Sequence, residues 1–398
     1  AHTIDPAERA TAPSVPPRPP RVGVISAWFD PELPGMWSNV PAGVVDELKR
    51  LGVYAGRRDA TAWAPLARVI YRRSKRSMRD EAWTLRKRMR PITRATEMVL
   101  RAMPDRDVDG WIHFVGANGP VVRGRYVTLF EMSPAQILEA GRLGWAGSFG
   151  YPGATLEQLA WVARRQVVLY RNAYTVCMSS RWAADSLVRD HGIDARKIRI
   201  VGYGRNGDPR PPEHRDWSFP RFLFIGRDWR RKNGDAMVRA FARLRSEVPA
   251  ARLDVVGNHP LIGVEGVVEH GVVPGHEPEG RAKIEALYAA ASCFMLPSFI
   301  EPFGLSCLEA GAAGLPSITT KVGGMAESVG PGGILVDPYD DDDIYRAMRT
   351  LSDSDTARVM GEAALARAPL FTWGAVAQRV VRALDLAPVP GVELAGFL

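Results

Sequence analysis

The stretch from residue 301 to residue 316 reads E-P-F-G-L-S-C-L-E-A-G-A-A-G-L-P. It follows a short apolar run, C-F-M-L-P at 293–297, of the kind that forms a buried strand. Two carboxylates, Glu301 and Glu309, stand eight positions apart across a Pro-Phe-Gly-Leu turn. A strand that ends in a polar loop and opens a helix is where α/β proteins bind phosphorylated ligands. The stretch therefore predicts a ligand-binding helix start in an α/β fold.

The geometry of this helix start suits an extended ligand. Pro302 fits the first turn, and Gly304 lets a ligand approach the backbone. Glu309 lies about five residues into the helix, roughly 8 Å along its axis, while Glu301 stays at the mouth of the loop. The two carboxylates can therefore bind hydroxyls at the two ends of a sugar joined through a diphosphate to a ribose. Three backbone N–H groups point out of the helix start between them, those of Phe303, Gly304 and Leu305.

An ordinary helix start, with glutamates favoured by the helix dipole, is the alternative for either glutamate taken alone. The whole string, continuing through Gly311, Gly314 and Pro316, favours a binding site.

Two glutamates facing a diphosphate would repel it, so nearby cations are required. Arg227 and Lys232 supply them in the string G-R-D-W-R-R-K-N-G, directly after the apolar run at 222–225. Arginine offers a planar fork and lysine a point charge, and both suit a pyrophosphate. Taken alone, the string also fits a solvated basic loop, and we expect Arg230 and Arg231 to be exposed.

Size and composition indicate a two-domain globular protein. A chain of 398 residues is too long for one average domain. Its three cysteines, at 177, 293 and 307, have no metal or redox spacing, which favours a reducing compartment. The first twenty residues lack the apolar segment of a signal peptide, and no run approaches about 18 apolar residues. We therefore expect a cytoplasmic protein.

The net charge of +8 could favour binding to nucleic acid, to a membrane surface or to an anionic substrate. No zinc finger, RNA-binding aromatic signature or basic heptad arm is present in the sequence, so we expect no nucleic-acid partner. Residues 68–101 are strongly basic, with apolar residues interleaved. Such a segment can lie on an anionic membrane, form a solvated face, or line an acceptor entrance.

The pattern along the chain predicts five parts. Strands and helices alternate in both halves, which implies parallel sheets. The predicted parts are a disordered Pro-rich leader (1–20), a first α/β domain (21–204), a linker (205–220), a second α/β domain (221–370), and a C-terminal helix and tail (371–398).

The motif at 301–316 resembles the E-x7-E signature of bacterial family-four retaining glycosyltransferases. The resemblance implies the GT-B fold: two Rossmann-like domains facing across a cleft, with a C-terminal helix crossing back to the first domain. The loop with Arg227 and Lys232 resembles the family's G-R-x…K-G element, here with Asn233 inserted before the glycine. Gly323-Gly324-x-x-Glu327 resembles the family's G-G-x-x-E turn, with a structural role expected.

The resemblance also assigns roles in donor binding. Glu301 and the amides of 303–305 would hold the sugar, Glu309 the ribose, and Arg227 and Lys232 the departing diphosphate. Gly35 falls where the family has a glycine loop touching the diphosphate, and Val273 falls near the expected position of the base.

The first domain departs from the family pattern at one position. Many members carry a Thr-x-His element, whereas this chain reads Thr128-Leu129-Phe130, so phenylalanine falls where the histidine would be. Glu131 and His113 are the substitute candidates for orienting an acceptor hydroxyl or the donor sugar. A histidine at such a strand end is as often a core residue as a ligand.

The resemblance implies a retaining, front-face transfer of a hexose-type sugar, in which the leaving phosphate oxygen takes the acceptor proton. The donor would be a UDP-sugar, with GDP- and ADP-sugars as alternatives, and no essential metal is expected. The acceptor would be a small molecule: a natural product, a sugar or a sugar phosphate. The oligomeric state stays open.

Three other functions stay open. A lipid-linked or polysaccharide acceptor at the membrane surface would use the basic region 68–101. A catalytically silent nucleotide-sugar-binding subunit would have the fold without turnover. A glycoside hydrolase would use Glu301 and Glu309 as an acid–base pair, but it leaves the loop with Arg227 and Lys232 without a purpose.

Overall fold

The computed structural model describes residues 18–26, 31–32, 36–60, 97–98, 100–105, 107–114, 122–275 and 277–398. Gly35, most of the basic region 68–101 and nearly all of the predicted leader lie outside these ranges.

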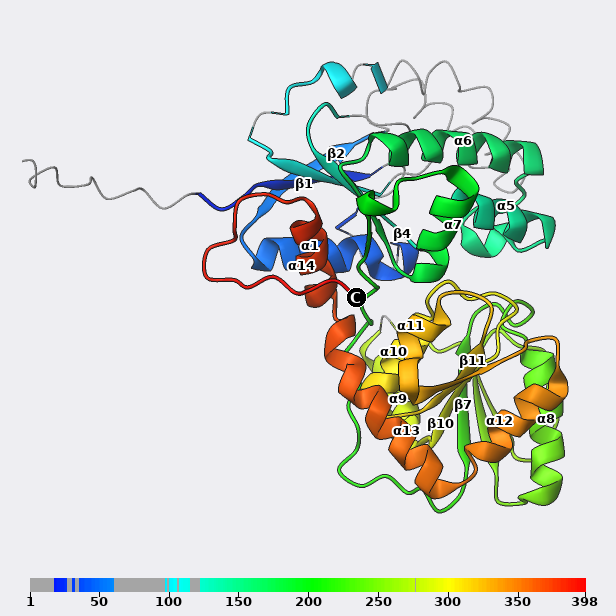
Figure 1. Cartoon of the computed structure of the whole chain (residues 1–398). Coiled ribbons are helices and arrows are strands. Elements are labelled where there is room, and N and C mark those ends of the chain that lie inside the picture. The colour runs from blue at the N-terminus through cyan, green and yellow to red at the C-terminus, as the bar shows by residue number, and fades with distance from the viewer. Residues whose placement is uncertain are drawn as a thin grey trace, which may run out of the picture.

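The first domain is a parallel sheet covered by helices (Figure 1). Its six described strands lie in the order β2-β1-β3-β4-β5-β6. The strands are β1 (Val22–Ser26), β2 (Tyr54–Asp59), β3 (Gly110–His113), β4 (Tyr126–Phe130), β5 (Thr175–Met178) and β6 (Ile198–Ile200). The described helices are η2 (Met36–Asn39), α1 (Val40–Arg50), α5 (Pro134–Arg142), η3 (Ala146–Phe149), α6 (Leu156–Asn172), α7 (Arg181–His191) and η4 (Ala195–Lys197).

The second domain repeats this plan. Its six described strands are also parallel and lie in the order β12-β11-β10-β7-β8-β9. The strands are β7 (Arg221–Gly226), β8 (Arg252–Gly257), β9 (Val267–Gly271), β10 (Cys293–Leu296), β11 (Ser317–Thr320) and β12 (Gly333–Val336). The helices are α8 (Gly234–Glu247), α9 (Pro278–Ala290), α10 (Leu305–Ala312), α11 (Met325–Val329), η5 (Gly330–Gly332), α12 (Asp341–Thr350) and α13 (Ser354–Arg367).

The C-terminal segment returns to the first domain. After η6 (Ala368–Phe371), helix α14 (Trp373–Ala383) packs beside α1 (Figure 1). Val376 and Val380 of α14 are buried in the same cluster as Val44 and Leu48 of α1. The predicted fold, with two Rossmann-like parallel sheets and a C-terminal helix crossing back, is therefore confirmed.

Strand order locates the ligand-binding edge of the second sheet. Neighbouring β7 and β10 are where the order reverses, with β8 and β9 on one side and β11 and β12 on the other. Open parallel sheets bind ligands in the crevice at the carboxyl ends of the strands at such a switch point. The loops that follow β7 and β10 are the two that the sequence singles out, at 227–233 and 297–304.

None of the helices in the described ranges has the length and hydropathy that a membrane span requires. No group of three or more His, Cys, Asp or Glu side chains in this part of the chain could hold a metal ion.

The return of α14 depends on a buried arginine. Arg379 is only 2% exposed and donates hydrogen bonds to three backbone carbonyls, those of Val201, Leu370 and Gly396. Replacing Arg379 by methionine would leave these carbonyls unpaired. We expect a loss of about 2–4 kcal/mol in the free energy of unfolding, measured by urea denaturation.

Arg382 provides the matched control, because it lies on the same helix, is exposed and also contacts carbonyls. Arg382→Met should change stability by less than about 0.5 kcal/mol. Equal losses in the two variants would contradict a special role for Arg379.

Candidate active site

The site forms where the loop after β7 meets the loop after β10. The two strands are hydrogen-bonded neighbours, with Phe224 opposite Met295, so both loops leave the same edge of the sheet. Residues 70 positions apart in sequence, Arg231 and Glu301, are brought into contact by this pairing.

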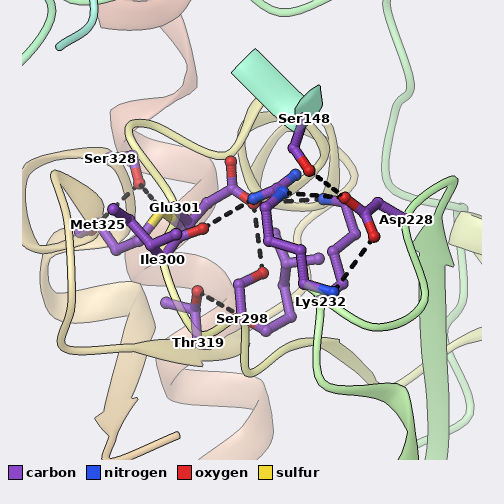
Figure 2. A network of polar contacts seen from close by, with 11 residues as sticks. Ser148, Asp228, Lys232, Ser298, Ile300, Glu301, Thr319, Met325 and Ser328 are labelled. Atoms are coloured by element: carbon purple, nitrogen blue, oxygen red, sulfur yellow. Dashed lines mark hydrogen bonds and ion pairs between the residues drawn. The ribbon is translucent and has the colours of Figure 1, made fainter. Parts of the chain in front are cut away.

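Glu301 is the centre of a polar network (Figure 2). Its side-chain oxygen Oε2 accepts from Arg231 Nη1 at 3.2 Å, Lys232 Nζ at 3.3 Å and Ser298 Oγ at 3.3 Å. No described residue donates a hydrogen bond to Oε1. Among the described residues, the carboxylate is thus held through one of its two oxygens.

The charge of Glu301 is fixed by its neighbours. Glu301 is 7% exposed, and burial alone would raise the pKa of its carboxyl. The positive charges of Lys232 and Arg231 outweigh burial and lower the pKa of Glu301 to about 2. Glu301 is therefore ionised at neutral pH although it is almost completely buried.

The helix start after Glu301 has free backbone donors. Helix α10 begins at Leu305, with Gly304 as N-cap in a left-handed conformation, φ +64°. The amides of Phe303, Gly304 and Leu305 donate to no described residue. Pro302 lies before the N-cap, so the expectation that it occupies the first turn of the helix is wrong.

Phe303 has a second structural role. Its side chain is 1% exposed and packs into the core of the first domain, with ring centroids 5.8 Å from those of Tyr203 and Phe371. The helix start is thereby fastened to the opposite domain as well as to its own.

Glu309 lies in α10, about one helical turn after Leu305, the first residue of the helix. Its Oε2 accepts from the Tyr288 hydroxyl at 3.0 Å. Burial raises the pKa of Glu309 to about 7, against hydrogen bonds from Tyr288 and the backbone of Asn206, which lower it. The two glutamates of the motif therefore differ: Glu301 is fully ionised at neutral pH, whereas Glu309 titrates there.

Arg227 and Val273, also predicted for the donor side, lie in the loops that follow β7 and β9. Arg227 is exposed and forms no hydrogen bond or ion pair with a described residue. Val273 follows β9 and is partly buried against the core of the second domain. Asn233, the inserted residue, is the N-cap of α8 and has the left-handed backbone conformation, with φ +58°. Its side-chain amide donates to Pro338 O at 2.6 Å.

The candidates in the first domain are placed differently from each other. Glu131 directly follows β4 and is partly buried. The pKa of Tyr203 is raised mainly by burial and further by the negative charge of Glu131. His113 is fully buried at the end of β3, with its ring 5.8 Å from that of Tyr126. Burial lowers the pKa of His113 to about 3, so its imidazole is neutral and has no exposed surface.

The sequence did not identify all residues of the site. Arg231 was expected to be exposed, which is wrong: it is 8% exposed and bonds Glu301, whereas Arg230 is exposed as expected. The turn that brings Arg231 inward is stabilised by hydrogen bonds of Lys232 N to Asp228 O and of Asn233 N to Arg230 O. The burial of Arg231 depends on its contact with Glu301, 70 positions away, for which the loop itself carries no signal.

The G-G-x-x-E turn lies directly beside Glu301. Gly323 pairs with Glu301 as an isolated parallel bridge, and Gly324 N donates to Glu301 O at 3.2 Å. A Cβ atom on Gly323 would lie 1.9 Å from Glu301 O, so only glycine allows this approach. Glu327 accepts from Arg181 N at 2.9 Å and so joins α11 to the start of α7 in the first domain.

Comparison with solved structures defines the class. The chain is similar to sucrose-phosphate synthase from Thermosynechococcus elongatus, with TM-score 0.63 and 19% identity over 91% of this chain and 98% of that one. It is also similar to HepE of Anabaena in complex with UDP and glucose, with TM-score 0.58 and 15% identity over 92% and 99%. The fold is GT-B.

The sequence comparisons agree with this fold. Residues 219–354, which contain both site loops, match the family described as Glycosyl transferases group 1, and this match confirms the resemblance inferred from the motif. Relatives named D-inositol 3-phosphate glycosyltransferase include those of Corynebacterium aurimucosum, 35% identical over 39% of this chain and 41% of that protein. Another, from Corynebacterium jeikeium, is 33% identical over 58% and 61%. The chain spans about half the length of the curated relatives that it matches.

The raised pKa of Glu309 predicts a pH-dependent stability. An unfolded glutamate titrates near pH 4.3, so between about pH 4.3 and 7 the folded state holds a proton that the unfolded state has lost. The stabilisation from this proton is complete below the unfolded pKa and is lost as pH rises through about 7.

Glu309→Gln mimics the protonated carboxyl at every pH. Its melting temperature relative to wild type should increase from pH 5 to pH 8 and then level off. A difference that stays constant over this range would contradict the raised pKa. Glu279→Gln, on the exposed surface of α9, is the control and should show no trend.

Proposed function

We propose that this protein is a retaining glycosyltransferase that moves a hexose-type sugar from a nucleotide diphosphate sugar to a hydroxyl of a small-molecule acceptor. The observation that carries the proposal is the state of Glu301. It is an ionised carboxylate, buried at the switch point of the second sheet, fixed through Oε2 by two cations and without a described donor at Oε1.

The arrangement around Glu301 suits a donor of this kind. Glu301 Oε1 would accept from a sugar hydroxyl, and the amides of 303–305 would donate to the sugar or to phosphate oxygens. Glu309 would accept from the ribose hydroxyls. Arg227, exposed and without an ion pair to a described residue, would bind the diphosphate together with Lys232.

The proposed reaction needs no protein nucleophile. The bond between the anomeric carbon and the phosphate oxygen breaks, and a bond from that carbon to the acceptor oxygen forms on the same face. The acceptor proton passes to the leaving phosphate oxygen. Lys232 and Arg227 stabilise the negative charge that develops on the diphosphate, which is the electrostatic part of the catalysis.

The comparisons support specific substrates for the first experiments. The similar HepE structure holds UDP and glucose, so a UDP-hexose is the first donor, followed by GDP- and ADP-hexoses. The matched relatives are named for D-inositol 3-phosphate, so a phosphorylated polyol is the first acceptor class. In the first domain, Glu131 is the better-placed candidate to orient the acceptor, because His113 has no exposed surface.

The test is an incubation of the purified chain with each nucleotide sugar and a panel of polyol phosphates, sugars and natural products. We expect release of nucleoside diphosphate, a product heavier by one hexose, and retained anomeric configuration in the proton NMR spectrum. Inverted configuration would contradict the retaining mechanism. If the protein binds nucleotide sugar but turns over no acceptor, a silent binding subunit is favoured. If it is active only on vesicles with a lipid acceptor, the membrane alternative is favoured. If it hydrolyses a glycoside without nucleotide, a hydrolase is favoured.

Lys232 tests the proposed stabilisation of the leaving group. Lys232→Ala should lower kcat by about 100-fold, the usual effect of removing one electrostatic donor to a transition state. Affinity for the nucleoside, measured by calorimetry, should change much less. Lys283→Ala on the exposed face of α9 is the matched control and should behave as wild type. Parallel losses in kcat and nucleoside affinity would argue against the leaving-group role.

A further inference from the structure

Arg231 is the one of the three arginines in the loop after β7 that is buried. It is 8% exposed, whereas Arg227 and Arg230 are exposed. Taking a guanidinium out of water is costly, and the cost is offset when its charge is paired and hydrogen-bonded. Arg231 Nη1 donates to Ile300 O at 2.7 Å and to Glu301 Oε2 at 3.2 Å, so one nitrogen binds both the backbone and the carboxylate of the β10 loop.

Lys232 contacts the same oxygen of Glu301 but is held less firmly. Its Nζ lies 3.3 Å from Glu301 Oε2, and it donates to no backbone carbonyl of a described residue. Lysine is a point charge on a flexible stem, whereas the arginine fork is rigid. A diphosphate with two or more negative charges would therefore draw Lys232 away from Glu301, and Arg231 would remain.

The first domain covers Arg231 from the other side. The Phe149 ring of η3 lies 5.3 Å from the guanidinium carbon, a cation–π distance. Asp228 Oδ2 lies 3.5 Å from Arg231 Nε, and the same carboxylate oxygen accepts from Ser148 Oγ, also in η3 (Figure 2). Arg231 thus joins Glu301 to the face of the first domain that closes over the site.

We propose that Arg231 is a positioning residue, which keeps the Glu301 carboxylate charge-paired and oriented toward the donor sugar while Lys232 is occupied by the diphosphate. This inference rests on the proposed function. It assigns the two neighbouring cations different tasks: Lys232 acts on the leaving group, and Arg231 acts through Glu301.

The charged and titratable groups around this pair define the expected pH effect. Glu301 faces Lys232, Arg231 and the Cys307 thiol, and Arg231 in turn faces Asp228. With Arg231 removed and Lys232 on the diphosphate, burial would favour the protonated form of Glu301. The acidic side of the pH profile of kcat should then move to higher pH, so that kcat falls as the pH decreases toward 5.

The experiment compares Arg231→Met, Arg231→Lys and the matched control Arg230→Met in the full chain. Calorimetry gives Kd for UDP and for the UDP-hexose that the wild type uses, and steady-state kinetics give kcat from pH 5 to 9. For Arg231→Met we expect kcat to fall by tenfold or more, while Kd for UDP changes by less than about threefold. The ratio of Kd for UDP to Kd for the UDP-hexose should decrease, because the variant loses affinity for the sugar part. Arg231→Lys should restore part of kcat and of the pH profile, and Arg230→Met should match wild type.

Three results would decide against the inference. Arg231→Met could equal Arg230→Met in all measurements, or it could lose UDP and UDP-hexose affinity in parallel, or its pH profile could stay unchanged. If Arg231→Met does not fold, Phe149→Leu provides the second variant. It removes the aromatic ring that covers Arg231 and should change kcat, affinity and the pH profile in the same directions, by smaller amounts. Wild-type protein that binds neither UDP, GDP nor ADP would overturn the proposed function itself, and the inference with it.

Discussion

A nearly buried, ionised carboxylate at Glu301 is the constraint on which the rest of the site depends. Such a group is stable only if its charge is matched, and Arg231 and Lys232 match it through one oxygen. This requirement fixes where the loop after β7 must lie relative to the loop after β10. The parallel pairing of those two strands at the reversal of strand order satisfies the requirement.

The same network links the two domains. Asp228 and Arg231 meet Ser148 and Phe149 of η3, Trp145 stacks on Phe299 with centroids 5.9 Å apart, and Phe303 enters the first-domain core. Contacts to the first domain therefore surround Glu301. In a transferase this arrangement has a chemical use, because closing the site removes water from the reacting centre and strengthens each electrostatic contact there.

The sequence predicted the features that depend on local pattern. The helix start at 301–316 and the alternation of strands and helices follow from short-range signals, whereas Lys232 was placed beside the E-x7-E motif by charge compensation and by the family resemblance. Arg231 was misjudged because its burial depends on a contact 70 positions away. The pKa difference between Glu301 and Glu309 likewise follows from tertiary neighbours that no motif contains.

A crystal structure of the protein with UDP and, separately, with a UDP-hexose bound tests these roles most directly. We expect the ribose on Glu309 and the diphosphate between Arg227 and Lys232, with Lys232 moved away from Glu301. We also expect Glu301 Oε1 on a sugar hydroxyl while Arg231 keeps its contact with Oε2. A nucleotide bound elsewhere, or bound at this site with Glu301 turned away from the sugar, would contradict these roles.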